Sequence, residues 1–145
     1  MHEFDEKDMS ILDVLKHNSS LSIGKIARKT GIPIATVHHR IKGLKVKGII
    51  SKYTIVIDKA KLGRKMVVHI LIKAMPKSDH IALLKSLMQN DRVEDGSAIT
   101  GAFDLIIKVR VGDVDELDRF VLKYLRTLND ISETQTMIAF QNILK

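Results

Sequence analysis

Hydrophobic positions repeat with a helical period at the start of the chain and, further along, with strand-like and helical periods in alternation. Near the N-terminus, apolar residues at Met9, Leu12 and 14–15 share one side of a helix, which is predicted to run over roughly Glu6–His17. Asp5 precedes this pattern and is predicted to cap the helix, because Asp is among the best N-cap residues.

Two further helical patterns flank a tight turn at Gly31-Ile32-Pro33, and this arrangement is typical of a helix-turn-helix. Ser22 is the expected N-cap of the helix before the turn. The buried stripes expected for the two helices are, in order, Ile23, Ile26 and Ala27, and then Val37, Ile41 and Leu44.

The second of these helices is predicted to turn a polar and basic surface outward. Such a surface suits the DNA major groove, whose base edges offer acceptors to Lys and His and a thymine methyl to Ala or Thr. The same pattern also fits an ordinary three-helix bundle with a solvated basic face, and spacing alone leaves this alternative open. The residues expected to point outward are Ala35, Thr36, His38, His39 and Lys42.

After this helix, Gly48 is placed to cap its C-terminus, and the following residues alternate like a strand. This alternation predicts either a wing or a strand that leads away. No Gly/Ser-rich linker follows. We therefore expect a DNA-binding domain over residues 1–51, an ordered hinge strand over 52–63 and a second domain over 64–145.

The second domain is predicted to be a ferredoxin-like βαββαβ fold, with an antiparallel four-stranded sheet and two helices on one face. Its first strand is apolar on both faces, so we expect one face to meet a second copy of the chain. The expected order is strand 66–74, helix 79–89, strand 93–100, strand 101–111, helix 114–128 and strand 131–140.

The net charge of +7 is unevenly distributed. Residues 1–51 hold nine Lys and Arg against five Asp and Glu, whereas residues 64–145 hold twelve against eleven. No acidic residue lies between Ser22 and Ile50. This basic segment points to a polyanionic partner, and double-stranded DNA is the one that a helix-turn-helix would bind.

Other classes of chemistry lack their signatures. The chain has no Cys, which excludes disulfides, thiolate zinc sites and a Cys nucleophile. It has no P-loop, dinucleotide-binding, HExxH or GxSxG motif, and the adjacent His38 and His39 are not spaced to bind one metal ion. We expect no enzyme activity, cofactor or metal. The acidic N-terminus and the lack of an apolar run of transmembrane length predict a cytoplasmic protein.

A set of short motifs also resembles a known family over the whole chain. In order, these motifs are Phe4-Asp5 with Asp8, Ile11-Leu12, Ile26-Ala27, Gly31, Val37, Arg40-Ile41, Leu44, residues 48–50 with Tyr53, Leu62-Gly63, residues 100–105 and residues 134–136. Together, at this spacing, they are similar to the leucine-responsive and asparagine-operon regulators, the Lrp/AsnC or feast/famine family of prokaryotic transcription regulators.

The resemblance implies an α+β protein in which a winged helix-turn-helix precedes a ferredoxin-like domain, often called the regulation-of-amino-acid-metabolism domain. In the family this second domain dimerises, builds tetramers or octamers and senses small amino acids. Two positions depart from the family pattern. Pro33 stands where Ser commonly caps the recognition helix, and Gly43 lies within that helix, at a cost of roughly 1 kcal/mol relative to Ala.

The pattern and the resemblance together predict a sequence-specific DNA-binding transcription regulator, whose dimer presents two recognition helices to operator half-sites. Basic side chains would hold phosphates, and the outward residues of the recognition helix would read bases. The predicted DNA-binding residues are Ser22, Lys25, Arg28, Lys29, Ile34, Ala35, Thr36, His38, His39, Arg40, Lys42, Lys45 and Lys47.

The resemblance also implies an amino-acid effector bound between dimers. Thr134 and Thr136 fall on one face of a strand, where both hydroxyls can donate to a ligand carboxylate, and Asp104 can pair with the ammonium group. A turn-stabilising role for Asp104, and an interface without effector, stay open. The predicted effector-binding residues are Thr100, Gly101, Ala102, Asp104, Thr134 and Thr136.

Two other functions are also compatible with the sequence. An architectural, chromatin-like protein that coats DNA would share the basic face and the oligomers. Some haem-pathway decarboxylases resemble the same two-domain architecture, but they carry an aromatic- and His-rich signature where this chain has GAFDLIIKV, and that signature is absent.

Overall fold

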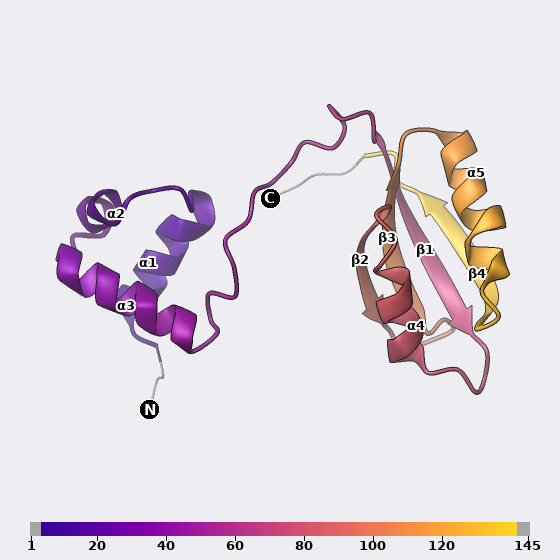
Figure 1. Ribbon diagram of the computed structural model, residues 1–145, viewed down its shortest axis with the longest axis horizontal. Coiled ribbons are helices and arrows are strands. Elements are labelled where there is room, and N and C mark those ends of the chain that lie inside the picture. Colours follow the sequence, from indigo (N-terminus) through magenta and orange to yellow (C-terminus); the bar gives the residue numbers. More distant parts are fainter. Residues whose placement is uncertain (1–3, 142–145) are drawn as a thin grey trace. The chain divides into compact units, whose positions relative to one another are not determined.

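The computed structural model describes residues 4–141, and the chain divides into two compact units, residues 1–56 (unit 1) and residues 57–145 (unit 2). Within the described residues, unit 1 contains α1 (Glu6–His17), α2 (Ile23–Thr30) and α3 (Ile34–Val46) (Figure 1). Unit 2 contains β1 (Met66–Ala74), α4 (His80–Leu87), β2 (Val93–Ala98), β3 (Leu105–Val111), α5 (Val114–Lys123) and β4 (Ile131–Ile138). None of the helices in residues 4–141 has both the length and the apolar character needed to cross a bilayer.

The first two helices begin at the capping residues that the sequence predicts. The Asp5 carboxylate accepts a hydrogen bond from the backbone N–H of Asp8 (3.0 Å), and the Asp8 carboxylate accepts one from the backbone N–H of Asp5 (3.3 Å). This reciprocal pair satisfies two N–H groups that the helix itself cannot pair. Ser22 Oγ accepts a hydrogen bond from the backbone N–H of Lys25 (3.4 Å) and caps α2 in the same manner.

The turn between α2 and α3 depends on glycine and proline. Gly31 ends α2 with φ of 69°, a left-handed conformation that favours glycine. Pro33 then precedes α3, which starts at Ile34 without a side-chain cap because proline has no acceptor there. Gly48 adopts φ of 73° just after α3. This conformation confirms the prediction that Gly48 ends the recognition helix.

The core of unit 1 lies where its three helices meet. Ile11, Ile26 and Val37, one from each helix, are at most 1 % exposed. The expectation that Met9 faces this core is wrong, since its side chain is 60 % exposed. Ile11 and Leu15 form the buried stripe of α1 instead, and Met9 lies on the other side of the helix.

The strand expected after α3 is not formed. Residues 51–58 adopt neither helix nor strand, and the described part of unit 1 contains no wing hairpin. A lone strand leaves its backbone N–H and C=O groups unpaired, and the described part of unit 1 offers no neighbouring strand. Ile55 and Val56 in this segment are 77 % and 89 % exposed.

Unit 2 has the predicted topology. Its antiparallel sheet has the strand order β2-β3-β1-β4, and α4 and α5 cover one face (Figure 1). Val68, Ile70 and Ile72 of β1 point to these helices and pack in one core with Leu87 and Phe120. Alternation along a strand sends the intervening residues of β1 to the opposite face.

That opposite face, which we call the open face, has no helix over it in the described residues. His69 and Leu71 of β1 lie beside Lys108 and Ile106 of β3, and beside Met137 and Gln135 of β4. Leu71 and Ile106 are half-buried, and Met137 is exposed. The open face is therefore a mixed surface with an apolar centre.

The hairpin between β2 and β3 is wider than predicted, because residues 99–104 form a loop instead of extending both strands. The Asp104 backbone N–H donates to Ile72 O (3.0 Å), and the Asp104 carboxylate accepts a hydrogen bond from the Ala74 backbone N–H (2.8 Å). These bonds attach the loop to the end of β1. Gly101 within the loop has φ of 118°, which ordinary residues rarely adopt.

The helix expected over residues 114–128 also ends early, at Lys123. A 3-10 turn, η1 (Leu125–Thr127), follows it. The Thr127 hydroxyl donates to Tyr124 O (2.7 Å), a local bond that competes with continuation of the α-helix.

Ion pairs hold the start of unit 2 against its sheet. The Glu94 carboxylate accepts a hydrogen bond from Arg110 (2.8 Å) and lies 2.9 Å from Lys59 Nζ, in the turn before β1. The side chains of Glu94 and Arg110 are only 13 % and 10 % exposed. Burial acts to raise the pKa of the Glu94 carboxyl, but Lys59 and Arg110 outweigh it and lower the pKa below its ordinary value.

We expect Glu94→Gln to lower the free energy of unfolding by roughly 2 kcal/mol at pH 7, because Arg110 loses its charged partner while buried. Since folding lowers the pKa of Glu94, its stabilising contribution is present above the ordinary value of 4.5 and is lost as the pH falls through the folded-state value. Denaturant unfolding between pH 3 and 7 measures this difference. The exposed Glu133→Gln serves as control, and parallel pH profiles for Glu94→Gln and wild type would contradict the assignment.

Candidate nucleic-acid interface

The buried stripe of α3 determines which of its side chains face solvent. Val37, Ile41 and Leu44 pack inward. The predicted reading residues lie on the other side, where the side chains of Ile34, Ala35, His38, His39 and Lys42 are exposed and Thr36 is half-buried at the edge. The helix thus presents a polar, basic surface of the shape that enters a major groove.

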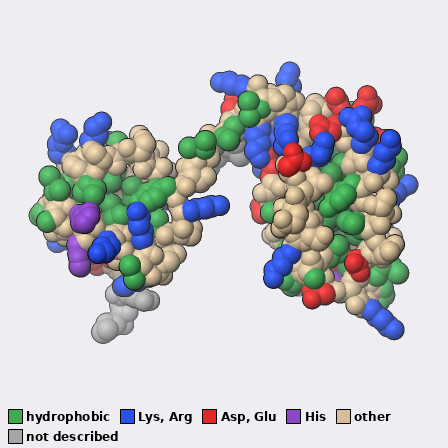
Figure 2. Space-filling view, viewed as in Figure 1, with side chains coloured by type: hydrophobic (Ala, Val, Ile, Leu, Met, Phe, Trp, Pro, Cys, Tyr) green, Lys and Arg blue, Asp and Glu red, His purple; other side chains and the backbone are tan. Residues whose placement is uncertain are grey.

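Exposed cations surround this helix face. Figure 2 shows His side chains together with Lys and Arg side chains on the visible face of unit 1. The exposed basic residues of α2 and α3, with the first residue after α3, are Lys25, Arg28, Lys29, Lys42, Lys45 and Lys47. Such a distribution suits the phosphates on either side of a groove.

Two of these cations are held by aromatic rings. Lys45 Nζ lies 4.7 Å from the centre of the Tyr53 ring, and Lys47 Nζ lies 5.2 Å from that of Phe4. Helical periodicity cannot reveal these contacts, because both rings lie outside the helices. Phe4 and Tyr53 are therefore additions to the candidate site, and they restrict where the two ammonium groups can lie.

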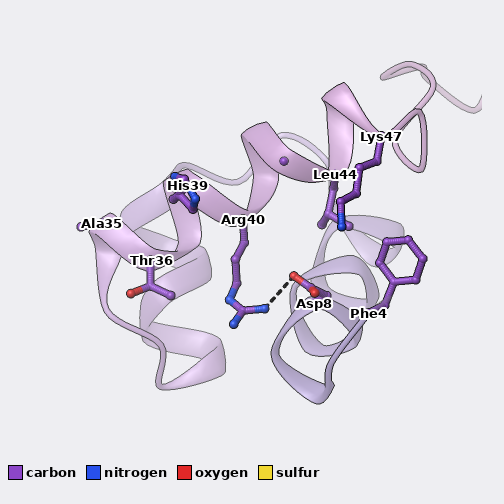
Figure 3. Close-up of a pocket in the computed structure, with 9 residues that line it drawn as sticks. Phe4, Asp8, Ala35, Thr36, His39, Arg40, Leu44 and Lys47 are labelled. Atoms are coloured by element: carbon purple, nitrogen blue, oxygen red, sulfur yellow. Dashed lines mark ion pairs between the residues drawn. The ribbon is translucent and has the colours of Figure 1, made fainter. Parts of the chain in front are cut away.

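Arg40 has a different position from the one expected of a free phosphate ligand. Its Nη1 donates to Asp5 Oδ1 (2.6 Å). The same atom lies 3.0 Å from Asp8 Oδ1 (Figure 3). The backbone N–H of Asp8 and, to a smaller extent, Arg40 hold the pKa of the Asp5 carboxyl below its usual value. The positive charge of Arg40 thus offsets part of the negative charge at the cap of α1 and joins α1 to α3.

A groove of about 570 Å³ runs along α3 on the side nearest α1 (Figure 3). It begins beside the reading residues and ends near Lys47. Its lining residues are Phe4, Asp8, Ala35, Thr36, His39, Arg40, Gly43, Leu44 and Lys47.

The predicted effector residues occupy two places in unit 2. Thr134 and Thr136 pair in register with Ile72 and Ile70, so they share the helix-covered face of the sheet. Thr134 lines a hollow of about 450 Å³, together with Arg126, Ile131, Ser132 and Glu133.

Thr100, Gly101 and Ala102 are exposed in the loop before β3. Because β1 lies between β3 and β4, it separates this loop from Thr134 within one copy of the chain. The Asp104 carboxylate already accepts the Ala74 N–H, which supports the turn-stabilising alternative for this residue.

This combination, a helix-turn-helix with a basic outer face and a separate βαββαβ unit, defines a DNA-binding regulator with a second domain available for assembly or sensing. Residues 4–51 match the winged helix-turn-helix DNA-binding family, and residues 65–145 match the Lrp/AsnC ligand binding domain. The chain belongs to the Lrp/AsnC family of transcription regulators.

Individual relatives agree with this assignment. A helix-turn-helix-type transcriptional regulator of Pyrococcus horikoshii is 33 % identical over 96 % of this chain and 94 % of its own length. The structure of Escherichia coli AsnC has a TM-score of 0.89 at 27 % identity, covering 99 % of this chain and 97 % of that one. A transcriptional regulator of Neisseria meningitidis in complex with L-Met has a TM-score of 0.92 at 20 % identity, covering 98 % and 93 % of the two chains.

Proposed function

We propose that this regulator binds operator DNA sequence-specifically as a homodimer and that a small α-amino acid modulates the binding. The observation that carries the proposal is the outward face of α3, where His38, His39 and Lys42 are exposed among cations. A two-fold dimer would place two such helices on half-sites separated by whole turns of about 10 base pairs. We propose that the protein is a regulator rather than an enzyme and that it acts in the cytoplasm.

The DNA contacts divide into two kinds. Side chains between Ile34 and Lys42 read base edges, because the N-terminal part of a recognition helix lies deepest in the major groove. Arg40 positions α3 through Asp5 and Asp8 rather than holding a phosphate. The proposed base-reading residues are Ile34, Ala35, Thr36, His38, His39 and Lys42, and the proposed phosphate contacts are Ser22, Lys25, Arg28, Lys29, Lys45 and Lys47.

The open face of unit 2 supports self-association. Its centre carries half-buried Leu71 and Ile106 beside exposed Met137, and apolar groups of this kind gain free energy when a second copy covers them. The exposed Ile55 and Val56 of the extended segment add further apolar surface. We propose that two copies associate through the open face and that dimers can join further into tetramers or octamers.

The hollow beside Thr134 supports an amino-acid effector. Arg126 and Glu133 line it, and within residues 4–141 no ion pair occupies either side chain. A guanidinium and a carboxylate match the two charges of a zwitterion, and the Thr134 hydroxyl can donate to its carboxylate. The L-Met complex of the Neisseria regulator supports this ligand class. We propose that the site is completed by Thr136 of the same copy and by the loop of residues 100–102 of another copy.

The family assignment favours a regulator over a DNA-coating protein or a decarboxylase. A coating protein would bind all sequences with nearly equal affinity, whereas specific regulators typically bind their operator at least about a thousandfold more tightly. Genomic binding-site selection with the purified protein, at a stated salt concentration, distinguishes these two cases and identifies the operator.

Replacing His39 or Lys42 with Ala is expected to weaken operator binding by roughly 1–3 kcal/mol and to relax sequence preference, because a base contact is lost. Lys45→Ala should weaken operator and unrelated duplex by the same factor, because phosphates carry no sequence information. Fluorescence anisotropy with both duplexes measures the two effects, and Lys123→Ala in unit 2 is the control. Unchanged operator affinity in all three variants would show that the reading face is wrongly assigned.

The full-length chain should sediment as a dimer or larger at micromolar concentration. Ile106→Lys places a charge on the open face and is expected to shift the population toward monomer, because the ammonium group would be buried without a partner. Ile81→Lys, on the exposed side of α4, is a matched control and should not change the sedimentation. Monomeric wild type, or equal behaviour of the two variants, would exclude the open face as the interface.

Thermal-shift measurements with each of the twenty amino acids at millimolar concentration should find at least one that raises the Tm. A ligand present at about ten times its Kd adds roughly 1.4 kcal/mol to the free energy of unfolding. Thr134→Val should abolish this shift by removing a donor, whereas Ser97→Ala at the far edge of the sheet should retain it. If no amino acid changes the Tm or the oligomer size, the effector proposal fails and the DNA proposal stands.

A further inference from the structure

Gly43 lies inside α3 although nothing in the described chain requires glycine there. Its φ is not positive, so an L residue would adopt the same backbone without strain. A Cβ added at Gly43 would meet no atom within 4 Å outside the backbone of its own helix. Alanine would therefore fit, and it would stabilise the helix because its helix propensity is higher than that of glycine. A reason for the glycine has to come from outside this chain.

The position of Gly43 indicates which surface of the protein requires a glycine. Gly43 lines the groove along α3, between Arg40 on one side and Lys47 on the other. Figure 3 shows Arg40 and Lys47 projecting from α3 toward Asp8 and Phe4. Arg40 is fixed by the carboxylates of α1 and Lys47 by the Phe4 ring. Both neighbours are thus held beside a stretch of helix that carries no side chain.

We infer that Gly43 is the point at which the DNA sugar-phosphate backbone comes closest to α3. A deoxyribose lies against the bare helix surface at Gly43, and an adjoining phosphate pairs with Lys47. Glycine permits this approach because it has no Cβ to keep the two backbones apart. The inference rests on the proposed insertion of α3 into the major groove.

The chemistry of the groove favours backbone over base edges at this position. The charge of Arg40 is taken up by two carboxylates, so Lys47 is the cation left to meet a phosphate at this end. Phe4 and Leu44 give the groove apolar walls, which suit a deoxyribose ring better than the donors and acceptors of a base edge. Gly43 also follows Lys42, the last of the residues proposed to read bases, on the C-terminal side of α3.

Full-length Gly43→Ala and Gly43→Leu test this inference, since both residues are good helix formers and the fold is retained. Each variant is expected to keep or raise the Tm. The Kd for the operator should rise about threefold with Ala and more than about tenfold with Leu, which is a loss of about 1.4 kcal/mol per factor of ten. The Kd for an unrelated duplex should rise by the same factors, because the lost contact is to backbone.

Gly24→Ala in α2 is the matched control. Gly24 also has no atom within 4 Å of an added Cβ and no positive φ, but it does not line the groove. Its variant should gain stability, and because Gly24 lies between the proposed phosphate contacts Ser22 and Lys25, the expected result is a change in Kd smaller than that of Gly43→Ala.

Unchanged DNA affinity in Gly43→Leu would overturn the inference, and so would a loss confined to the operator, which would indicate a base contact. Failure of wild type to bind any duplex would instead overturn the proposed function, and the inference with it.

Discussion

Burial of the apolar stripe of α3 is the interaction on which the interface of unit 1 depends. Val37 is completely buried, and Ile41 and Leu44 are nearly so. Each such side chain contributes about 1.5–3 kcal/mol when it leaves water. Because an α-helix has a fixed period, anchoring these three positions also fixes the direction of every other side chain. The face that carries His39 and Lys42 is thus determined by packing before any DNA is present.

The two units use their charges differently. In unit 2, acidic side chains such as Glu94, Asp91 and Glu116 are paired with cations, and these pairs connect strands, helix and preceding turn. In unit 1, Arg40 has carboxylate partners, whereas no acidic residue lies among the cations of residues 22–50. Charge in unit 2 therefore serves mainly its own structure, and charge in unit 1 is available to a polyanion.

Features that depend on local pattern could be predicted from the sequence, and features that depend on distant partners could not. Neighbouring residues determine the helix caps at Asp5 and Ser22, and they also determine the bounds of β1. The Arg40–Asp5 ion pair joins residues 35 positions apart, and Asp104 meets Ala74 across 30 positions. The alternating segment after α3 lacks a partner strand in the described chain, which no local pattern reveals. The positions of the candidate effector residues likewise depend on strand order.

The extended segment of residues 51–58 has a consequence for cooperativity. Eight residues can span at most about 28 Å, so each helix-turn-helix is confined to a small volume around its own sheet. If two copies associate through their sheets as proposed, the second helix-turn-helix would meet its half-site at an effective concentration on the order of millimolar. Avidity of this kind can strengthen binding by about 10²–10⁴-fold without any new contact. Operators whose half-sites lie farther apart than this segment can reach do not gain this avidity, so the length of the segment contributes to the choice of operator.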